Sequence, residues 1–326
     1  MTLLRRIAPA ILLVVLAPIV AEFLLGDFSI REIPIVLALL PLYGGGALLI
    51  REIARRAGRG WPAIVLLGLA YALLEEGFLT QSLFNPDYVG LRLLDYGYLP
   101  ALGTSLNWCM HVLSIHVVWS VATPILIAEG FAGGRRTEPW LRIPGLVVTT
   151  LLFLLGCVST SAFSLKASPF VATAAQFSAV GALAALAIVA AFLTRRARPS
   201  GATRTAPRPM VVFIASLGLA MAFTFADQRG YAGVPPIAGL LARVVIEGAA
   251  AAMLLRWSGS RDWRPVHYLA VVSGTTLTYA IFGTLTFLRG HTHLGRPTGA
   301  VDVAGQLILA ALVFLAIWRG AVRSRN

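Results

Sequence analysis

The chain has few charged residues, one lysine and two cysteines, and each shortage excludes a class of protein. Only 13% of its 326 residues are charged, 58% are hydrophobic, and the mean hydropathy is +0.80. A soluble domain carries about 25% charged residues, so this chain could not cover a surface that faces water. Because Cys109 and Cys157 lie singly in apolar segments, a disulfide framework and a multi-cysteine zinc site are excluded.

The apolar residues come in blocks of about 20, the length at which a helix crosses the hydrocarbon core of a bilayer. About ten such blocks predict an all-α fold, a polytopic transmembrane helix bundle. The predicted spans are residues 7–25, 33–50, 61–84, 104–129, 143–163, 169–193, 209–226, 236–256, 265–288 and 303–318.

The positions of the basic residues indicate how the chain is oriented in the membrane, and they do not indicate a nucleic-acid partner. They number 27 against 14 acidic residues, a net charge of +13 that on a soluble protein would suggest nucleic acid. Here arginines gather in alternate short connections between apolar blocks, so the expected partner is the lipid bilayer and no nucleic acid. The positive-inside rule then places both termini in the cytoplasm, in a multi-pass protein of the cell membrane.

No segment is long enough to fold as a separate soluble domain, so residues 1–326 are predicted to form a single integral membrane domain. A basic, proline-rich connection at 194–208 lies between two groups of about five spans. The corresponding halves, 1–165 and 166–326, would have opposite orientations, which is the arrangement of an inverted repeat.

Two adjacent acidic residues, Glu75 and Glu76, stand inside the apolar stretch 61–84. Charge in hydrocarbon is costly unless it is paired, neutralised or hydrated, so an intramembrane carboxylate is by default a functional-site hypothesis. A rise of 1.5 Å per residue places Glu75 about 20 Å from the inner end of its span. On the next span, His111 falls about 10 Å below the outer face and His116 near the middle. These four residues are the predicted catalytic group.

Other polar residues inside predicted spans give a second set, expected to bind substrate. Asn107 lies four residues before His111 and shares its helix face. Arg243 and Glu247 are also four apart, so an ion pair within their helix explains both. Alternatively, Arg243 pairs with the adjacent glutamates. Three carboxylates near span ends, Glu22, Glu52 and Glu129, are expected to reach water or arginine and receive no role in the site.

The sequence assigns no metal and leaves the cofactor open. The HExxH spacing of zinc hydrolases is absent. His111 and His116 diverge by about 140° around their helix and do not converge on one ion unaided. His291 and His293 form an isolated HxH in a loop, where solvated histidines are common.

The paired glutamates, followed by a helix with a buried histidine, resemble the CAAX-protease and bacteriocin-processing family, also labelled abortive-infection proteins. The resemblance covers residues 61–120. Glu75 and Glu76 match the glutamates of the family motif EExxxR, in which Thr80 replaces the arginine. His116 and Ser120 fit a loose form of its HxxxS motif.

The family contains glutamate-dependent intramembrane proteases, so the resemblance implies a membrane-embedded peptidase or hydrolase. Glu75 or Glu76 would activate water as a general base, and His111 or His116 would stabilise the oxyanion or coordinate a metal. The substrate would be a hydrophobic peptide.

Two other functions remain open, and the sequence does not decide whether the chain is an enzyme. Spans in two inverted groups, with carboxylates and histidines in the membrane, also suit a proton-coupled secondary transporter of a small molecule. A non-catalytic subunit of a membrane complex needs no chemistry at all.

Overall fold

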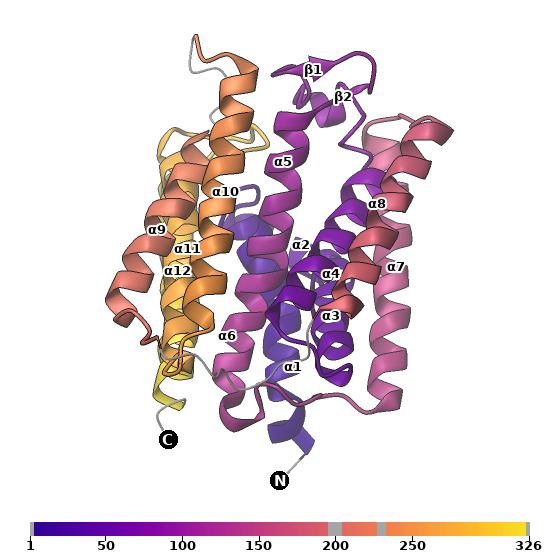
Figure 1. The fold of residues 1–326 in the computed structure, drawn as a ribbon. Coiled ribbons are helices and arrows are strands. Elements are labelled where there is room, and N and C mark those ends of the chain that lie inside the picture. Colours follow the sequence, from indigo (N-terminus) through magenta and orange to yellow (C-terminus); the bar gives the residue numbers. More distant parts are fainter. Residues whose placement is uncertain (1–2, 195–203, 227–232, 324–326) are drawn as a thin grey trace.

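The computed structural model describes residues 3–194, 204–226 and 233–323, and within these ranges the chain is almost entirely helical. Within the described residues, nine helices are long and apolar enough to cross a membrane, and a shorter apolar helix covers Ile7–Phe23. Together they confirm the predicted all-α, polytopic membrane bundle (Figure 1). The strands among these residues are β1 (Tyr98–Leu99) and β2 (Thr104–Ser105), which pair antiparallel in one short hairpin.

Several spans change helix type along their length, because π-helical segments, labelled η1, η3, η4 and η6, continue the α-helices. The described elements are α1 (Leu3–Pro18), η1 (Ile19–Phe23), η2 (Ile30–Glu32), α2 (Ile35–Leu39), η3 (Leu40–Gly44), α3 (Gly45–Arg56), α4 (Trp61–Leu74), η4 (Glu75–Leu79), η5 (Tyr88–Gly90), α5 (Leu106–Ile115), η6 (His116–Ala122), α6 (Thr123–Ala132), η7 (Gly133–Arg135), α7 (Ile143–Ala167), α8 (Ala174–Leu193), α9 (Pro209–Ala226), α10 (Pro236–Ser258), α11 (Pro265–Leu288) and α12 (Ala300–Arg323).

The start of α1 and the end of α12 lie at the same end of the bundle, opposite the β1–β2 hairpin (Figure 1). This arrangement agrees with an even number of crossings. Which end faces the cytoplasm stays a prediction, and so does the division into halves. Of the connection at 194–208, residues 195–203 lie outside the described residues.

The spans differ in how much of their surface the protein itself covers. In the span Trp61–Leu79, which carries the two glutamates, 67% of the most apolar window is buried inside the bundle. In Ile143–Ala167 and Pro236–Ser258 the corresponding share is only 11%. The glutamates therefore sit on a central helix, whereas α7 and α10 present leucine, valine and isoleucine to the lipid.

Glycine lets the central helices approach one another closely. A Cβ atom on Gly46 of α3 would lie 2.5 Å from the ring of Tyr71 in α4. A Cβ atom on Gly77 of η4 would lie equally close to the side chain of Val180 in α8. In lipid no hydrophobic effect drives helices together, so close packing at small residues such as these glycines stabilises the contacts instead.

The third predicted span ends earlier than expected, at Leu79 instead of Phe84. Gln81 has a φ angle of 57°, which turns the chain out of the helix. The Gln81 side chain secures this turn by accepting a hydrogen bond of 2.7 Å from the backbone N–H of Ala172. Residues 80–84 consequently fold back beside the glutamates instead of extending the span.

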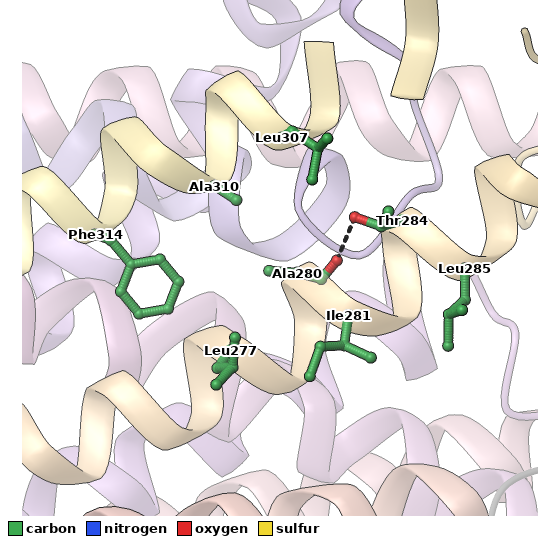
Figure 2. Close-up of a pocket in the computed structure, with 8 residues that line it drawn as sticks. All are labelled: Leu277, Ala280, Ile281, Thr284, Leu285, Leu307, Ala310 and Phe314. Atoms are coloured by element: carbon green, nitrogen blue, oxygen red, sulfur yellow. Dashed lines mark hydrogen bonds between the residues drawn. The ribbon is translucent and has the colours of Figure 1, made fainter. Parts of the chain in front are cut away.

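An open apolar groove with a volume of 330 Å³ lies between α11 and α12 (Figure 2). Its one polar side chain, Thr284, donates a 2.7 Å hydrogen bond to the carbonyl of Ala280 within its own helix. No titratable side chain lines the groove among the described residues, so we do not assign chemistry to it.

Candidate active site

The structure brings together three of the four predicted catalytic residues. The Nε2 atom of His116 lies 2.8 Å from Oε1 of Glu76, and its Nδ1 atom lies 3.5 Å from Oε2 of Glu75. All three side chains are buried, with no residue more than 6% exposed. An imidazole thus stands between two adjacent carboxylates in the middle of the bundle.

All four π-helical segments of the described chain contribute a side chain to this centre. Glu75 and Glu76 open η4, His116 opens η6, Glu22 belongs to η1 and Tyr43 belongs to η3. A π-helical turn inserts an extra residue into an α-helix and is often found at functional sites. Their convergence on one point sets this centre apart from ordinary helix packing.

The carboxylate of Glu76 is fully engaged by hydrogen-bond donors. Its Oε2 atom accepts hydrogen bonds from the hydroxyls of Ser82 and, at 3.0 Å, Thr80. The indole N–H of Trp108 donates to the Ser82 hydroxyl at 3.2 Å and steadies it. With His116 on its other oxygen, Glu76 is held as a fixed acceptor, which suits an orienting role.

The carboxylate of Glu75 is not engaged in the same way. Its Oε2 atom is buried and accepts no hydrogen bond from the described residues. The nearest nitrogen, Nδ1 of His116, is also 3.1 Å from the Ser120 hydroxyl. A buried acceptor without a partner is costly, and native proteins keep few of them. Glu75 is therefore the member of the pair that is free to act on a further group.

Three residues that the sequence analysis left outside the site, Glu22, Tyr43 and Tyr71, extend the centre. The Tyr43 hydroxyl donates a short hydrogen bond to Glu22, and the Tyr43 ring stacks on His116 with centroids 6.0 Å apart. The Tyr71 ring packs edge-on against the same imidazole at 6.2 Å. Glu22 was placed at a span end by hydropathy alone, and no sequence signal linked it to Tyr43.

Acidic groups outnumber basic groups at this centre. Glu22, Glu75 and Glu76 provide three carboxyl groups, and His116 provides one imidazole. None of the ion pairs formed among the described residues joins an arginine or lysine to these carboxylates. Glu75, Glu76 and His116 also offer one ligand atom each within 4.8 Å of one another, the spacing of a group that could hold a metal ion.

His111 does not join the glutamates, although it was predicted at a similar depth. Its ring stacks on Phe223 of α9, with centroids 5.6 Å apart and planes only 8° from parallel. It also lies 5.7 Å from the ring of Trp108. Equal depth was a poor guide here because His111 and His116 point to different sides of their helix.

The predicted substrate-binding residues hold α10 in place instead of meeting the glutamates. The guanidinium of Arg243 donates to the carbonyl oxygen of Asn107, and the Asn107 side chain donates to the carbonyl of Pro236 at 3.1 Å. Glu247 accepts a 2.8 Å hydrogen bond from Ser114 of α5. The expected pairing of Arg243 with Glu75 or Glu76 is not formed. A role in binding substrate stays a prediction.

A family model described as an uncharacterized membrane protein family matches residues 11–323, nearly the whole chain. The chain belongs to this family. The resemblance to the CAAX-protease family was therefore wrong: it rested on a few spaced residues, whereas the matching model spans all the helices. No curated protein and no solved structure matches the chain.

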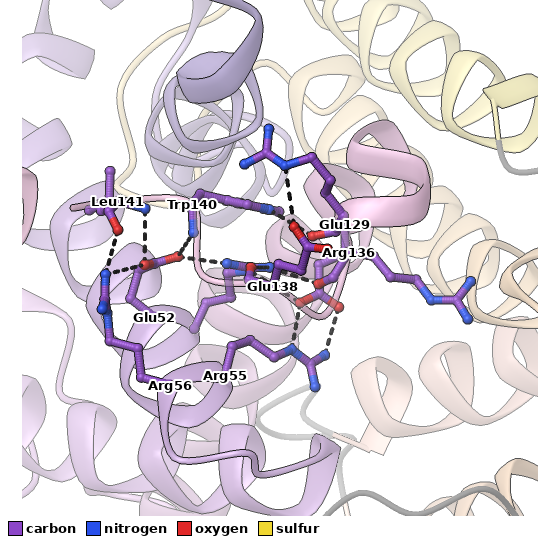
Figure 3. Close-up of polar contacts among 10 residues, drawn as sticks. Glu52, Arg55, Arg56, Glu129, Arg136, Glu138, Trp140 and Leu141 are labelled. Carbon is purple, nitrogen blue, oxygen red and sulfur yellow. Dashed lines mark hydrogen bonds and ion pairs between the residues drawn. The ribbon is translucent and has the colours of Figure 1, made fainter. Parts of the chain in front are cut away.

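A second buried charged cluster in this family member lies near the end of the bundle where α1 begins, and it is shown in Figure 3. Arg55 forms a two-pronged contact with Glu129 at 2.7 and 2.8 Å. Arg51 pairs with Glu52 at 2.6 Å and with Glu129 at 3.2 Å, and its guanidinium lies 3.4 Å from the ring centre of Trp140. As predicted, Glu52 and Glu129 reach arginine.

The same cluster fastens the connection between α6 and α7. Glu52 accepts hydrogen bonds from the backbone N–H groups of Trp140 and Leu141, at 2.8 and 3.1 Å. One Arg51 nitrogen donates to the carbonyls of Arg136 and Glu138, both at 2.7 Å. Because both glutamates are paired with arginine, we interpret this cluster as a structural clamp. We call it the inner cluster after the end of the bundle where α1 begins.

Proposed function

We propose that the chain is a membrane-embedded hydrolase in which Glu75, Glu76 and His116 activate a water molecule. The observation that carries the proposal is the unequal engagement of the two glutamates beside one imidazole. Glu76 is saturated with donors, whereas Oε2 of Glu75 accepts none. A general base must have a free lone pair within reach of the proton that it removes, and Glu75 has one.

The three residues divide the work as follows. Water attacks a carbonyl carbon of the substrate while its proton passes to Oε2 of Glu75, and that proton later reaches the leaving group. The imidazole of His116, close to Glu75, donates a hydrogen bond to the oxyanion that forms. Glu76 acts as a positioning residue because it fixes the opposite edge of the imidazole at 2.8 Å.

The location of the centre selects the class of substrate. The glutamates lie on a central span, surrounded by helices with lipid-facing apolar surfaces. A substrate that reaches them must be able to enter the hydrocarbon region of the membrane. A hydrophobic or lipidated peptide fits this requirement better than a soluble one.

The test is cleavage of a panel of fluorescence-quenched hydrophobic and lipidated peptides by the purified chain in detergent micelles. We expect Glu75→Gln to lower the rate at least about 100-fold, the usual contribution of a general base. Glu138→Gln, which alters an exposed carboxylate, is the matched control and should leave the rate unchanged. A wild-type chain that cleaves none of the panel, or an undiminished rate in Glu75→Gln, would overturn the proposal.

One observation favours a second candidate, proton-coupled transport. Beyond the Tyr43–Glu22 contact, the backbone N–H of Asp27 donates to the Glu22 carbonyl at 2.9 Å, and the Asp27 carboxylate lies 3.3 Å from Nδ1 of His293 in a surface loop. Titratable groups in such a series can relay protons. Solute uptake into proteoliposomes that follows an imposed pH gradient and is lost in Glu22→Gln would support transport. Uptake that ignores the gradient would exclude proton coupling.

A further inference from the structure

We propose that Glu75, Glu76 and His116 form a binding site for one divalent transition-metal ion of the Zn²⁺ or Mn²⁺ class. The inference rests on the proposed hydrolase and names the cofactor of the same centre: with the ion bound, Glu75 and His116 would serve as its ligands, and the ion would activate the water in place of the free Glu75 oxygen. It concerns metal binding, so it can be tested without a substrate.

The first argument is the shortage of cations at the centre. The carboxyl groups of Glu75 and Glu76 contact one imidazole, and the ion pairs of the described residues bring no arginine or lysine to them. An isolated carboxylate in a medium of low polarity is very unstable, so buried charges are paired or coordinate metals. A divalent cation would match the charge of the two carboxylates, as arginines do for the glutamates of the inner cluster.

The second argument is the placement of the donor atoms. One atom from each of the three residues lies within 4.8 Å of the other two. Bonds of about 2.0 Å to a tetrahedral zinc ion hold its donor atoms about 3.3 Å apart. The shortest contacts of His116, 2.8 Å from Nε2 to Glu76 and 3.5 Å from Nδ1 to Glu75, involve opposite ring nitrogens, and one ion can bind only one of them. Side-chain rotations that bring both carboxylates to the same nitrogen would complete the coordination.

The third argument is the unpartnered oxygen of Glu75. The residue is 2% exposed, yet its Oε2 atom accepts no hydrogen bond from the described residues and faces the imidazole. A metal ion would satisfy this atom. Glu76 already accepts supporting hydrogen bonds from Ser82 and Thr80. Nδ1 of His116 lies 3.1 Å from the Ser120 hydroxyl, which would accept its N–H if Nε2 bound the ion.

The donor types limit which ion fits. Carboxylate oxygens suit Mn²⁺ and related hard ions, and imidazole suits Zn²⁺, Fe²⁺ and Cu²⁺. A set of two carboxylates and one imidazole without thiolate therefore favours Zn²⁺ or Mn²⁺. Three protein ligands leave a coordination position open for water, as in catalytic zinc sites.

The experiment measures metal directly on the full chain in detergent. After dialysis against a chelator, binding of Zn²⁺ and of Mn²⁺ is followed by equilibrium dialysis with elemental analysis. We expect one ion per wild-type chain and at least about 100-fold weaker binding in Glu75→Gln and in His116→Asn, which each lose a ligand. The exposed variant Glu138→Gln should bind like the wild type.

Thermal unfolding gives a second readout that shows whether each variant is folded. An ion that binds only the folded chain raises the unfolding temperature. We expect this rise in the wild type and in Glu138→Gln, and no rise in Glu75→Gln. Failure of both ions to bind the wild type, or wild-type affinity in Glu75→Gln, would overturn the metal site.

The two proposals fail separately. Stoichiometric metal binding without cleavage of any peptide would keep the metal site and remove the hydrolase. Full cleavage by chelator-treated chain that binds neither ion would do the reverse. A strong infrared band of protonated carboxyl groups, lost in Glu75→Gln, would show protons in place of the ion and would also overturn the metal site.

Discussion

The bundle contains two buried charged clusters that solve the problem of charge in a membrane differently. In the inner cluster, arginines pair with both Glu52 and Glu129, and each carboxylate meets several donors. In the cluster around His116, carboxylates outnumber the imidazole and one oxygen of Glu75 lacks a donor. Both clusters consist of charged and polar residues that hydropathy alone would not place inside a membrane-spanning helix.

We interpret this difference between the clusters as the difference between a structural role and a functional role. A balanced network gains its stability from complete pairing, and removing one member leaves a buried charge behind. An incomplete network is tolerated only where the surrounding helices enforce it, and such local strain is characteristic of active sites. The π-helical turns lie at His116 and Glu76, whereas Arg51 and Glu129 stand on α-helical continuations of such turns, which supports the same division.

The largest effect is expected from breaking the inner cluster. Glu129→Ala removes the shared partner of Arg51 and Arg55, which leaves two buried guanidinium groups poorly compensated. Loss of one partner from a buried ion pair costs about 3–5 kcal/mol. We expect a large fall in unfolding temperature, followed by intrinsic tryptophan fluorescence in detergent. Glu138→Ala, at an exposed carboxylate, is the control. Equal temperatures for the two variants would contradict the clamp.

A smaller loss is expected from the support around Glu76. Ser82→Ala removes a hydroxyl that donates to Glu76 and accepts from Trp108. A hydrogen bond to a charged group contributes about 1.5–3 kcal/mol. We expect a loss of stability of about 2 kcal/mol, measured by the same unfolding assay, with peptide cleavage reduced but not abolished. Ser159→Ala, whose hydroxyl only bonds within α7, is the control. An undisturbed unfolding temperature in Ser82→Ala would show that Glu76 does not depend on this donor.

The sequence was sufficient for the spans and for part of the site. Blocks of apolar residues predicted the helices because hydropathy and length decide what crosses a bilayer. The same reasoning singled out Glu75, Glu76 and His116, because a charge inside an apolar run is costly and is rarely kept without a function. The arginine partners of Glu129 were also predictable from the basic residues at that end of the bundle.

The rest of the centre depended on backbone geometry that the sequence does not display. A π-helical turn changes which side chains face a neighbour, yet it leaves length and hydropathy unchanged. The stacking of Tyr43 on His116 and its hydrogen bond to Glu22 follow from such turns. The turn at Gln81, which brings Ser82 to Glu76, also replaced the last residues of a predicted helix.

The comparison of the two clusters predicts that replacing the unengaged glutamate, Glu75, does not lower the stability of the fold. Glu75→Gln removes an acidic group next to Glu76 without removing any hydrogen bond to Oε2. Active-site residues commonly lower stability in return for function. We therefore expect the chelator-treated variant to unfold at the same temperature as the wild type, or to gain about 1 kcal/mol. A loss as large as that of Glu129→Ala would mean that Glu75 is a structural residue and would remove the contrast between the clusters.

The smallest effect is expected where charge is paired in water, outside both clusters. Arg92 and Asp95, in the connection between η5 and β1, form a pair at 2.7 Å with side chains 67% and 53% exposed. Asp95 raises the pKa of Arg92, but exposed pairs are screened and contribute little. Asp95→Asn should leave the unfolding temperature unchanged at low and at high salt. A salt-dependent fall in the unfolding temperature would show that charge holds the connection between η5 and β1 in place. Burial would then no longer explain why this exposed pair and the two buried clusters differ.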